Sequence, residues 1–446
     1  MTERAAPVMP ATMPVGAPRA FHAMAKPSGA ICNLDCTYCF FLSKEMLYPG
    51  DRFRMADQTL ENYVRQTLEA HGPGEVVLAF QGGEPTLMGV AFFERTMEHI
   101  ARHARPSQTP LLTLQTNGVL LDDRWGAFLA EHNVLVGLSI DGPRDLHDIY
   151  RLDKAGRGTF DRVLEGYETI RRHGVDVNVL CTVNAGNASH PLEVYRFFRD
   201  ELDLRFMQFI PVVERSTEQL LSLANAGWGD RNSERPLYTN HGSSVTERSV
   251  GPLEWGEFLA TVFDEWVHHD VGEVFVGHFD AALASWLGID PAMCVLRETC
   301  GAAVAIEHNG DLYSCDHFVE PAHLLGNIGT TTMVELATSP KQRAFGQAKL
   351  DGLPEFCRRC EVRFACNGEC PKNRFTLTPD GEAGLNYLCA GYRSFFNHID
   401  GPMRIMADLV RSGRFADEIM GVFSSAGRNE PCPCGSGTKT KLCHGS

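Results

Sequence analysis

Apolar runs alternate with amphipathic segments over the first half of the chain. Mostly apolar runs at 76–80, 111–115, 134–140, 175–183 and 204–213 have the length and composition of buried strands. Segments with the helical spacing of apolar residues follow four of them, at about 91–104, 122–132, 161–173 and 191–200. Continuous apolar strands separated by helices are typical of a parallel sheet covered by helices. The pattern therefore predicts an α/β fold, with one more strand near 21–26.

Polar or glycine-rich residues stand where these strands end. Gln81 to Glu84 follow one strand, Thr116 to Gly118 follow the next, and Asp141 follows a third. The carboxyl ends of parallel strands meet at one edge, where both barrels and doubly wound sheets build their sites. The pattern thus predicts a site at this edge, but it does not distinguish a barrel from an open sheet.

The second half of the chain has a different organisation. Residues 214–253 are polar and rich in Gly, Ser and Asn, which predicts a long loop. Helical patterns follow at 254–269 and near 279–287, and another lies near 401–420. Residues 290–400 contain many cysteines and few long apolar runs, as expected if metal clusters organise that segment.

Eleven of the fifteen cysteines follow a tripartite pattern. Its parts are Cys32-x3-Cys36-x2-Cys39, then Cys294-x5-Cys300-x14-Cys315, then Cys357-x2-Cys360-x5-Cys366-x3-Cys370-x18-Cys389. Three thiolates leave one iron of a [4Fe–4S] cluster open for a substrate, and eight more are enough for two fully ligated clusters. Zinc is the alternative to an iron–sulfur cluster in each part of this pattern. The first triad offers zinc no fourth Cys or His nearby, whereas the eight later cysteines have the ligand count for two zinc sites.

Composition and charge indicate which partners and which cellular compartment to expect. The chain has 446 residues, 43% of them hydrophobic, and carries 56 acidic against 41 basic residues, for a net charge of −15. This balance, without a long basic block, argues against nucleic acid or an anionic membrane as the main partner. We expect no membrane span, because no run of about eighteen apolar residues exists. The segment 1–20 is predicted to be a disordered tail rather than an export signal, so we expect a cytoplasmic protein with reduced thiols.

The last twenty residues contain a separate group of ligands. Cys432, Cys434, Cys443 and His444 supply four soft ligands in a short basic loop, enough for one tetrahedral Zn²⁺. A metal-free, disordered tail is the alternative.

The first triad resembles the signature of the radical S-adenosylmethionine (SAM) superfamily, in which an aromatic residue, here Tyr38, precedes the last cysteine. In that family the open iron chelates SAM, and an electron from the cluster produces a 5′-deoxyadenosyl radical that abstracts hydrogen from carbon. The protein places the target C–H bond and excludes competing reactions.

The turn Gly82-Gly83-Glu84-Pro85 resembles the family motif that binds the amino group of SAM, and Glu84 suits an ammonium. Arg151 suits the SAM carboxylate, but a solvated surface charge is the alternative. The resemblance implies cofactor contacts from these residues: Tyr38, Phe41, Gln81, Gly82, Gly83, Glu84, Asn117, Ser139, Arg151 and Met207. Phe41 stands where many relatives carry tyrosine, which keeps stacking on adenine but removes a hydroxyl.

The eight later cysteines resemble the SPASM extension of peptide-modifying radical enzymes. By this resemblance one auxiliary cluster is held by Cys294, Cys300, Cys315 and Cys370, and the other by Cys357, Cys360, Cys366 and Cys389. That makes three [4Fe–4S] clusters in all, the auxiliary pair relaying electrons. Cys181, within a strand pattern, is interpreted as a core residue.

Several strand-end motifs narrow the resemblance to the anaerobic sulfatase-maturating enzymes over about 21–400. They are Phe80-Gln-Gly-Gly-Glu-Pro-Thr86, Leu114-Gln-Thr-Asn-Gly118, Gly137-Leu-Ser-Ile-Asp-Gly-Pro143, Gln208-Phe-Ile-Pro211 and Cys315-Asp316. The resemblance implies a partial (β/α)6 TIM-like barrel and oxidation of a Cys or Ser in a C/S-x-P-x-R segment to Cα-formylglycine. The implied partners are a nascent or unfolded sulfatase and an electron donor such as flavodoxin or ferredoxin.

Asp316 matches the base that the family is proposed to use on the substrate thiol or hydroxyl. We expect it to act if it reaches the target, with its pKa raised by burial. A surface or hydrogen-bonding aspartate is the alternative from chemistry alone.

The tail resembles the SEC-C zinc motif of the bacterial preprotein-translocation motor. We expect it to dock a chaperone, a translocation component or the sulfatase. The expected domains are a tail (1–20), a partial barrel (21–253), connecting helices or a last barrel unit (254–290), a SPASM domain (291–400), a C-terminal helix (401–425) and a zinc motif (426–446).

Two other functions remain open from the sequence. A related SPASM enzyme could form thioether or carbon–carbon crosslinks in a ribosomal peptide, although such enzymes often carry an N-terminal recognition domain for which the tail is too short. A non-catalytic iron–sulfur or zinc adaptor would have no reason to keep the open triad together with the GGEP turn.

Overall fold

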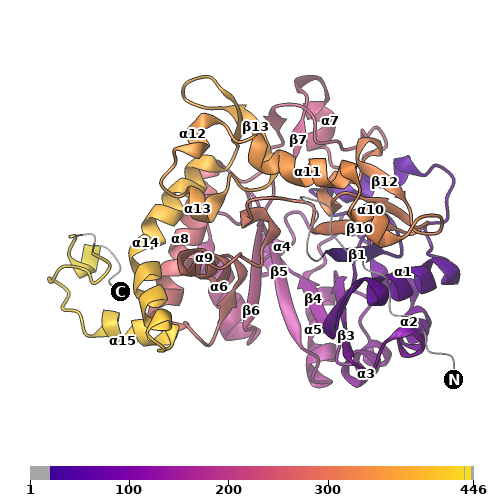
Figure 1. The fold of residues 1–446 in the computed structure, drawn as a ribbon, viewed down its shortest axis with the longest axis horizontal. Coiled ribbons are helices and arrows are strands. Elements are labelled where there is room, and N and C mark those ends of the chain that lie inside the picture. Colours follow the sequence, from indigo (N-terminus) through magenta and orange to yellow (C-terminus); the bar gives the residue numbers. More distant parts are fainter. Residues whose placement is uncertain (1–20, 436, 443–446) are drawn as a thin grey trace.

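The computed structural model describes residues 21–435 and 437–442, so segment 1–20 and the predicted ligands Cys443 and His444 lie outside the described residues. Within these ranges, ten strands form one sheet in the order β12-β11-β10-β1-β2-β3-β4-β5-β6-β9 (Figure 1). Their bounds are β1 His22–Lys26, β2 Gly74–Phe80, β3 Gln108–Thr116, β4 Leu135–Ser139, β5 Val177–Val183, β6 Phe206–Pro211, β9 Phe275–Val276, β10 Ala303–Glu307, β11 Asp311–Tyr313 and β12 Leu324–Asn327.

The central part of this sheet is parallel, as predicted. Strands β1 to β6 pair in sequence order, and β9 adds to β6 in parallel. On the other side of β1 lies β10, also parallel, with His22 opposite Ala303 and Lys26 opposite Glu307. The predicted α/β architecture is thereby confirmed, and the first strand of the cysteine-rich segment extends the same sheet.

Most helices agree with the predicted ranges, including those at 254–269 and near 279–287, which are α8 and α9. The predicted helix near 401–420 is wrong in its bounds, because α14 begins at Cys389 and ends at Arg411, and α15 covers Ile419–Ser424. Helix α1 was missing from the predicted elements. The helices of six or more residues are α1 Asp57–Ala70, α2 Val90–His103, α3 Asp123–Glu131, α5 Phe160–Arg172, α6 Pro191–Arg196, α8 Pro252–His269, α9 Gly277–Leu287, α11 Pro340–Asp351, α14 and α15.

The shorter elements lie mostly outside the barrel. The helices are α4 Arg144–His147, α7 Leu221–Asn225, α10 Met333–Ala337, α12 Glu355–Arg358 and α13 Arg363–Cys366. Two separate antiparallel pairs are β7 Arg215–Ser216 with β8 Ser244–Val245, and β13 Arg374–Leu377 with β14 Ala383–Asn386. The predicted loop 214–253 therefore contains β7, β8 and α7.

Alternation along the strands sorts apolar from polar side chains. In β2, Val76, Leu78 and Phe80 are buried among the helices, and Phe80 contacts Phe92 and Phe93 of α2 edge to face. Because side chains alternate across a strand, the other face of the sheet can carry polar groups such as Gln115 and Ser139. That face is where the site is built.

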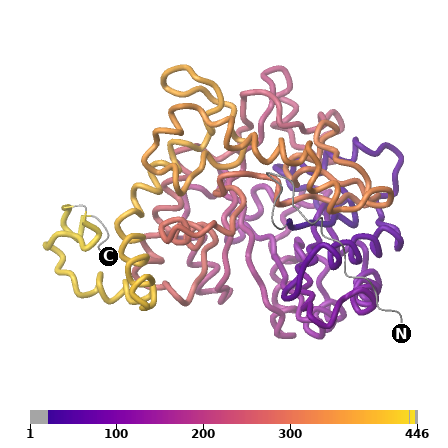
Figure 2. The backbone as a smooth tube through the Cα atoms, viewed as in Figure 1, coloured from indigo at the N-terminus to yellow at the C-terminus, as the bar shows by residue number. Residues whose placement is uncertain are grey.

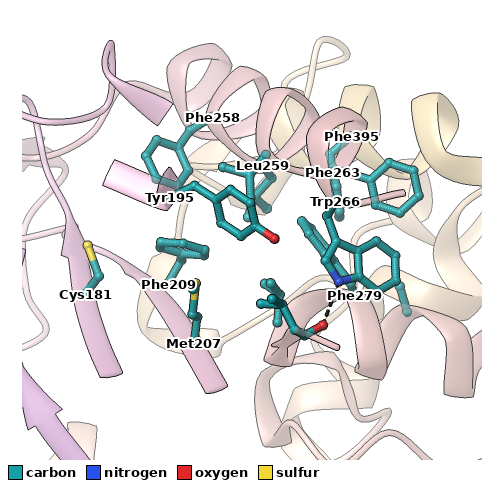
Figure 3. Packing of buried hydrophobic residues seen from close by; sticks show 14 of the residues in the cluster. Cys181, Tyr195, Met207, Phe209, Phe258, Leu259, Phe263, Trp266, Phe279 and Phe395 are labelled. Carbon is teal, nitrogen blue, oxygen red and sulfur yellow. Dashed lines mark hydrogen bonds between the residues drawn. The ribbon is translucent and has the colours of Figure 1, made fainter. Parts of the chain in front are cut away.

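A second core fills the space between β5, β6 and the helices α6, α8, α9 and α14 (Figure 3). Trp266 packs against Phe263 and Phe279 there and donates its indole N–H to the Val274 carbonyl at 2.7 Å. Cys181 is fully buried in the same core, which agrees with its interpretation as a packing residue.

Helices α8 and α14 approach each other at two glycines. A Cβ built on Gly391 would lie 1.9 Å from the Pro252 carbonyl oxygen, and one on Gly256 would lie 2.4 Å from the Gly391 carbonyl oxygen. No side chain fits at either position, so these glycines set how closely α14 lies on α8. This contact holds Cys389, at the start of α14, against the rest of the molecule.

The C-terminal segment after α15 lies beside α14, at the opposite end of the molecule from β1 and α1 (Figure 2). Cys432 is buried against the second core, and a Cβ on Gly401 of α14 would lie 2.3 Å from the Cys434 carbonyl oxygen. The absence of a side chain at Gly401 lets this segment reach the helix. No helix in the described part of the chain is both long and apolar enough to cross a bilayer.

The glycine contact between α8 and α14 can be tested directly. We expect Gly391→Ala to destabilise the protein by about 1–3 kcal/mol, because the added methyl group must displace backbone rather than a flexible side chain. Gly421→Ala in α15, where a Cβ meets nothing within 4 Å, is the matched control and should leave stability unchanged or slightly higher. Anaerobic thermal unfolding followed by circular dichroism measures both, and equal midpoints for the two variants would contradict the packing argument.

Candidate active site

The cysteine triad lies in the loop after β1, directly above the sheet edge. Cys36 is buried, while Cys32 and Cys39 are half-buried. Burial raises the pKa of all three thiols, and Cys36 and Cys39 add to the rise at Cys32. Three thiols close enough to repel one another as anions in a dry loop are suited to a positively charged iron cluster.

The glycines after β2 let the chain pass against this loop. A Cβ on Gly83 would lie 2.1 Å from the Ile31 carbonyl oxygen, and Gly82 has a φ of 128°, which favours glycine. Gly83 N–H donates to the Gly29 carbonyl at 2.8 Å and Glu84 N–H to the Ile31 carbonyl at 2.9 Å. The predicted GGEP turn is therefore bonded to the cysteine loop by its backbone.

The Glu84 carboxylate is fully buried and joins the ends of β2 and β3. One oxygen accepts from the Thr86 N–H, the Thr86 hydroxyl and the Thr116 hydroxyl, at 2.9, 2.6 and 2.8 Å. The other accepts from the Asn117 N–H at 2.8 Å. Burial raises the pKa of Glu84, and these donors offset part of the rise. Much of its bonding capacity is thus used to hold the site together.

Asn117 and Ser139 continue the site along the strand ends. Asn117 donates from Nδ2 to the Asn33 Oδ1 at 2.8 Å and lies 3.6 Å from the Cys32 sulfur. Gln115 donates from Nε2 to the Ser139 hydroxyl at 2.7 Å, over Gly137, where a Cβ would lie 2.1 Å from the Gln115 Oε1. Gln115 was missed in the sequence, although it stands two residues before Asn117 and therefore on the same face.

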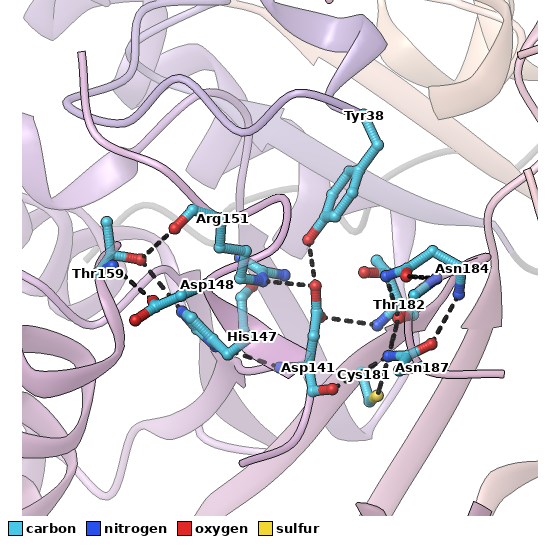
Figure 4. A network of polar contacts seen from close by, with 12 residues as sticks. Tyr38, Asp141, His147, Asp148, Arg151, Thr159, Cys181, Thr182, Asn184 and Asn187 are labelled. Atoms are coloured by element: carbon cyan, nitrogen blue, oxygen red, sulfur yellow. Dashed lines mark hydrogen bonds and ion pairs between the residues drawn. The ribbon is translucent and has the colours of Figure 1, made fainter. Parts of the chain in front are cut away.

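Arg151 is buried and ion-paired, so the alternative of a solvated surface charge is wrong (Figure 4). Its Nε lies 3.0 Å from Asp141 Oδ2, which also accepts from the Tyr38 hydroxyl at 2.6 Å. Burial disfavours the charged guanidinium, but Asp141, Tyr38 and Cys36 together outweigh it and the pKa of Arg151 is raised. Asp141 Oδ1 accepts from the Thr182 N–H at 3.0 Å, which ties the triad loop to β5.

Phe41 and Met207 lie apart from this network. The ring of Phe41 packs with Ala305, Tyr313 and Val319, and the Lys26 ammonium lies 3.9 Å from its centroid. Met207 is buried in the second core, on the helix side of β6 (Figure 3). The structure brings Tyr38, Gln81, Gly82, Gly83, Glu84, Asn117, Ser139 and Arg151 to the sheet edge, but it places Met207 on the opposite face of the sheet.

Asp316 forms an ion pair with Lys26, at the end of β1, and hydrogen-bonds Gln81. The Lys26 side chain is 2% exposed and that of Asp316 32%. Burial disfavours the carboxylate, but Lys26, His317 and Gln81 outweigh it and hold the pKa of Asp316 at about 2. The expected upward shift is therefore wrong, because the sequence did not reveal that Lys26 faces this group. A single Lys at the end of an apolar strand was the available signal.

The division of the eight later cysteines into two sets stays a prediction, and the electrostatic effects of the thiols on one another agree with it. Burial raises the pKa of each thiol, and wherever another thiol in this segment adds to the rise it belongs to the same set, as Cys370 and Cys294 do for Cys315. Cys357, Cys360, Cys366 and Cys389 line one cavity together with Tyr392. In the tail, Cys432 is buried and Cys434 half-buried.

Comparison with known proteins gives three family matches. Residues 27–198 match the radical SAM superfamily, 298–361 match an iron–sulfur cluster-binding domain called SPASM, and 428–446 match the SEC-C motif. The chain is 43% identical to the serine-type anaerobic sulfatase-maturating enzyme of Bacteroides thetaiotaomicron, over 86% of this chain and 91% of that one. The chain belongs to the anaerobic sulfatase-maturating enzymes. The predicted family and enzyme class are confirmed, which excludes the adaptor alternative.

Other members of the family agree. The cysteine-type enzyme of Clostridium perfringens is 34% identical, over 84% of this chain and 94% of its own length. A solved structure described as native anSMEcpe with bound AdoMet superposes with a TM-score of 0.74 at 32% identity, covering 87% of this chain and 99% of that one. The Streptococcus suis protein SuiB, at a TM-score of 0.54 and 14% identity, shows a likeness of fold alone.

The bonding of Glu84 leads to a prediction. In Glu84→Gln, the single amide oxygen can accept from the Thr86 N–H or from the Asn117 N–H but not from both, so one buried N–H must face the amide NH₂. We expect a loss of about 1–3 kcal/mol in stability and poorer retention of iron by the triad. Thermal unfolding and iron content measure these effects. Glu94→Gln, at an exposed position of α2, is the matched control; identical behaviour of the two variants would show that Glu84 has no such role.

Proposed function

We propose that this chain oxidises the Cβ of a Cys or Ser, within a C/S-x-P-x-R segment of a sulfatase, to Cα-formylglycine. The observation that carries the proposal is the placement of Asp316: it adjoins a cluster ligand, Cys315, and contacts Lys26 and Gln81 at the same strand ends that carry the triad and the GGEP turn. The relatives of this chain include sulfatase-maturating enzymes of the serine type and of the cysteine type.

The sheet edge offers a fitting site for SAM beside the triad. Cys32, Cys36 and Cys39 would hold a [4Fe–4S] cluster with one open iron, and the Gly82–Glu84 turn and Ser139 would hold SAM itself. When bound, this pair supplies a 5′-deoxyadenosyl radical that removes a hydrogen atom from substrate carbon. Gly83 keeps the space beside Ile31 free of side chains, since a Cβ there would clash with backbone.

The other polar groups at the site position the loop. Glu84 fixes the ends of β2 and β3, and its remaining capacity to accept is available to an ammonium. Arg151 and Tyr38 meet on Asp141, so the Arg151 charge serves first to orient the triad loop. If Arg151 also contacts the SAM carboxylate, its guanidinium must bind that carboxylate and Asp141 at the same time.

Asp316 is assigned to the proton of the substrate thiol or hydroxyl. With a pKa of about 2 its carboxylate is ionised at neutral pH and can accept a proton, but it is a weak base in this state. The base role therefore requires that substrate binding loosen the pair with Lys26 and raise the pKa of Asp316. Lys26 and Gln81 hold it in place, and one third of the side chain stays exposed toward a substrate. The hydrogen atom leaves Cβ, the proton goes to Asp316, and one further electron must leave the substrate. With a Ser substrate this gives the aldehyde directly. With a Cys substrate it gives a thioaldehyde, which water hydrolyses to the aldehyde with release of hydrogen sulfide.

The two sets of four cysteines fit that last requirement. Cys294, Cys300, Cys315 and Cys370 would hold one auxiliary [4Fe–4S] cluster, and Cys357, Cys360, Cys366 and Cys389 the other. Full ligation suits such clusters to electron transfer. We assign these roles to the segment 291–400 and include the start of α14, because Cys389 is its first residue.

The tail is assigned one zinc ion, held by Cys432, Cys434, Cys443 and His444. The match of 428–446 to the SEC-C motif supports this. Its place beside α14, at the far end from β1, suits a docking role for a chaperone, a translocation component or the nascent sulfatase rather than a catalytic one. The chemistry requires an electron donor, and we assign this role to a protein such as flavodoxin or ferredoxin.

The peptide reaction tests the proposal. The chain, reconstituted anaerobically with iron and sulfide, should convert a C-x-P-x-R peptide to its aldehyde in the presence of SAM and a reductant, with release of 5′-deoxyadenosine. Mass spectrometry of the Cys peptide and of a matched Ser peptide measures this and shows which residue is preferred. A peptide with Ala at the target position is the control. Release of 5′-deoxyadenosine with both peptides unchanged would favour a crosslinking enzyme instead.

Removing the proton acceptor should stop aldehyde formation without stopping SAM cleavage. We expect Asp316→Asn to lose at least about a hundredfold in aldehyde formation, the usual range for general-base catalysis, while SAM cleavage continues. Asp408→Asn, at an exposed position of α14, is the control and should keep both activities. Aldehyde formation at an unchanged rate in Asp316→Asn would exclude the base role.

A further inference from the structure

Four metal-ligating side chains meet on the outer side of the sheet, away from the cysteines. Helices α1 and α2 lie side by side there (Figure 1). Asp57 and Glu61 stand one turn apart on α1, and His99 and His103 one turn apart on α2. The Asp57 Oδ1 is 3.2 Å from His99 Nε2, and the Glu61 Oε1 is 3.0 Å from His103 Nε2. Residues four apart on a helix share a face, so two such pairs can surround one point.

We propose that Glu61, His99 and His103 bind a divalent transition-metal ion, with zinc as the probe, between α1 and α2. One ligand atom from each of the three lies within 4.8 Å of the other two, a separation that small side-chain rotations can close around an ion. The set of two imidazoles and one carboxylate suits zinc and its neighbours, whereas magnesium and calcium prefer oxygen alone.

The surroundings favour an ion over a simple network of surface charges. His99 is 4% exposed, and its Nδ1 is buried without a hydrogen-bond partner. Asp57, at 3.2 Å from the same ring, is placed to orient it or to serve as a fourth ligand. The competing cations are Arg95 on Asp57 and Arg102 on Glu61, and both side chains are about half exposed. Such exposed pairs are weak, so an ion can displace them.

The position of this site gives it a structural role. Helix α1 is the first long helix after the triad loop, and α2 begins at Val90, shortly after the GGEP turn. An ion bridging the two helices would join the two βα units that carry those segments. The ion would not touch substrate or SAM, so it would have no part in the proposed catalytic function. It is also a different ion from the zinc assigned to the tail.

Zinc binding by the full-length, cluster-reconstituted chain tests the proposal. Zinc per chain is measured by mass spectrometry after anaerobic dialysis against buffered free Zn²⁺, together with the zinc-induced shift of the thermal unfolding midpoint. The variant is Glu61→Gln/His103→Gln, which retains size but removes two ligands. The matched control is His190→Gln/Glu193→Gln, which breaks another His–Glu pair, at 2.9 Å, for which the described part of the chain offers no third ligand. Cys434→Ser identifies the zinc that belongs to the tail.

We expect the native chain and the control to bind one zinc more than Glu61→Gln/His103→Gln, and we expect this difference to persist in the Cys434→Ser background. The zinc-induced shift of the midpoint should shrink in the same variant only. Equal zinc content in the native chain and Glu61→Gln/His103→Gln would overturn the proposal, and so would an equal loss in both double variants. Iron content serves as the check that all variants fold.

Discussion

The buried carboxylate of Glu84 is the interaction on which the site depends. A charge in this position is costly unless donors surround it, and here the donors come from the chain just after β2 and just after β3. Satisfying the carboxylate therefore fixes the two strand ends relative to each other. Because the adjacent Glu84 and Gly83 N–H groups donate to the cysteine loop, the same residue also determines where Cys32 lies.

A second constraint is the parallel pairing of β10 with β1. It joins a strand from the cysteine-rich segment to the first strand of the barrel, nearly three hundred residues earlier. The register places Glu307 beside Lys26. Strand β11 then runs back antiparallel to β10, with Tyr313 opposite Ala305, and Cys315 and Asp316 follow two and three residues later. The barrel and the auxiliary segment thus share one sheet, so the distance from Asp316 to the triad is set by backbone hydrogen bonds rather than by a flexible linker.

The sequence predicted features that depend on neighbouring residues, but it did not predict contacts between segments that are far apart in the chain. The strands from Gly74 to Pro211 follow from apolar runs. Cysteine spacing indicates the clusters, and the division of the eight later cysteines into two sets comes from the resemblance to the SPASM extension. Lys26 as the partner of Asp316, Gln115 on Ser139 and the meeting of α1 with α2 depend on which faces the tertiary fold brings together. The start of α14 at Cys389 was missed because its apolar stripe begins inside a segment that the cysteines dominate.

The two side chains of the Lys26–Asp316 ion pair differ in their exposure to solvent. Lys26 is almost completely covered, with its ammonium against the Phe41 ring, while a third of Asp316 is exposed. A buried cation needs its counter-ion, which keeps the carboxylate in position and charged. The open side of Asp316 is the side left for a ligand. The Phe41 ring covers one side of the Lys26 ammonium, and Asp316 pairs with the ammonium from another side.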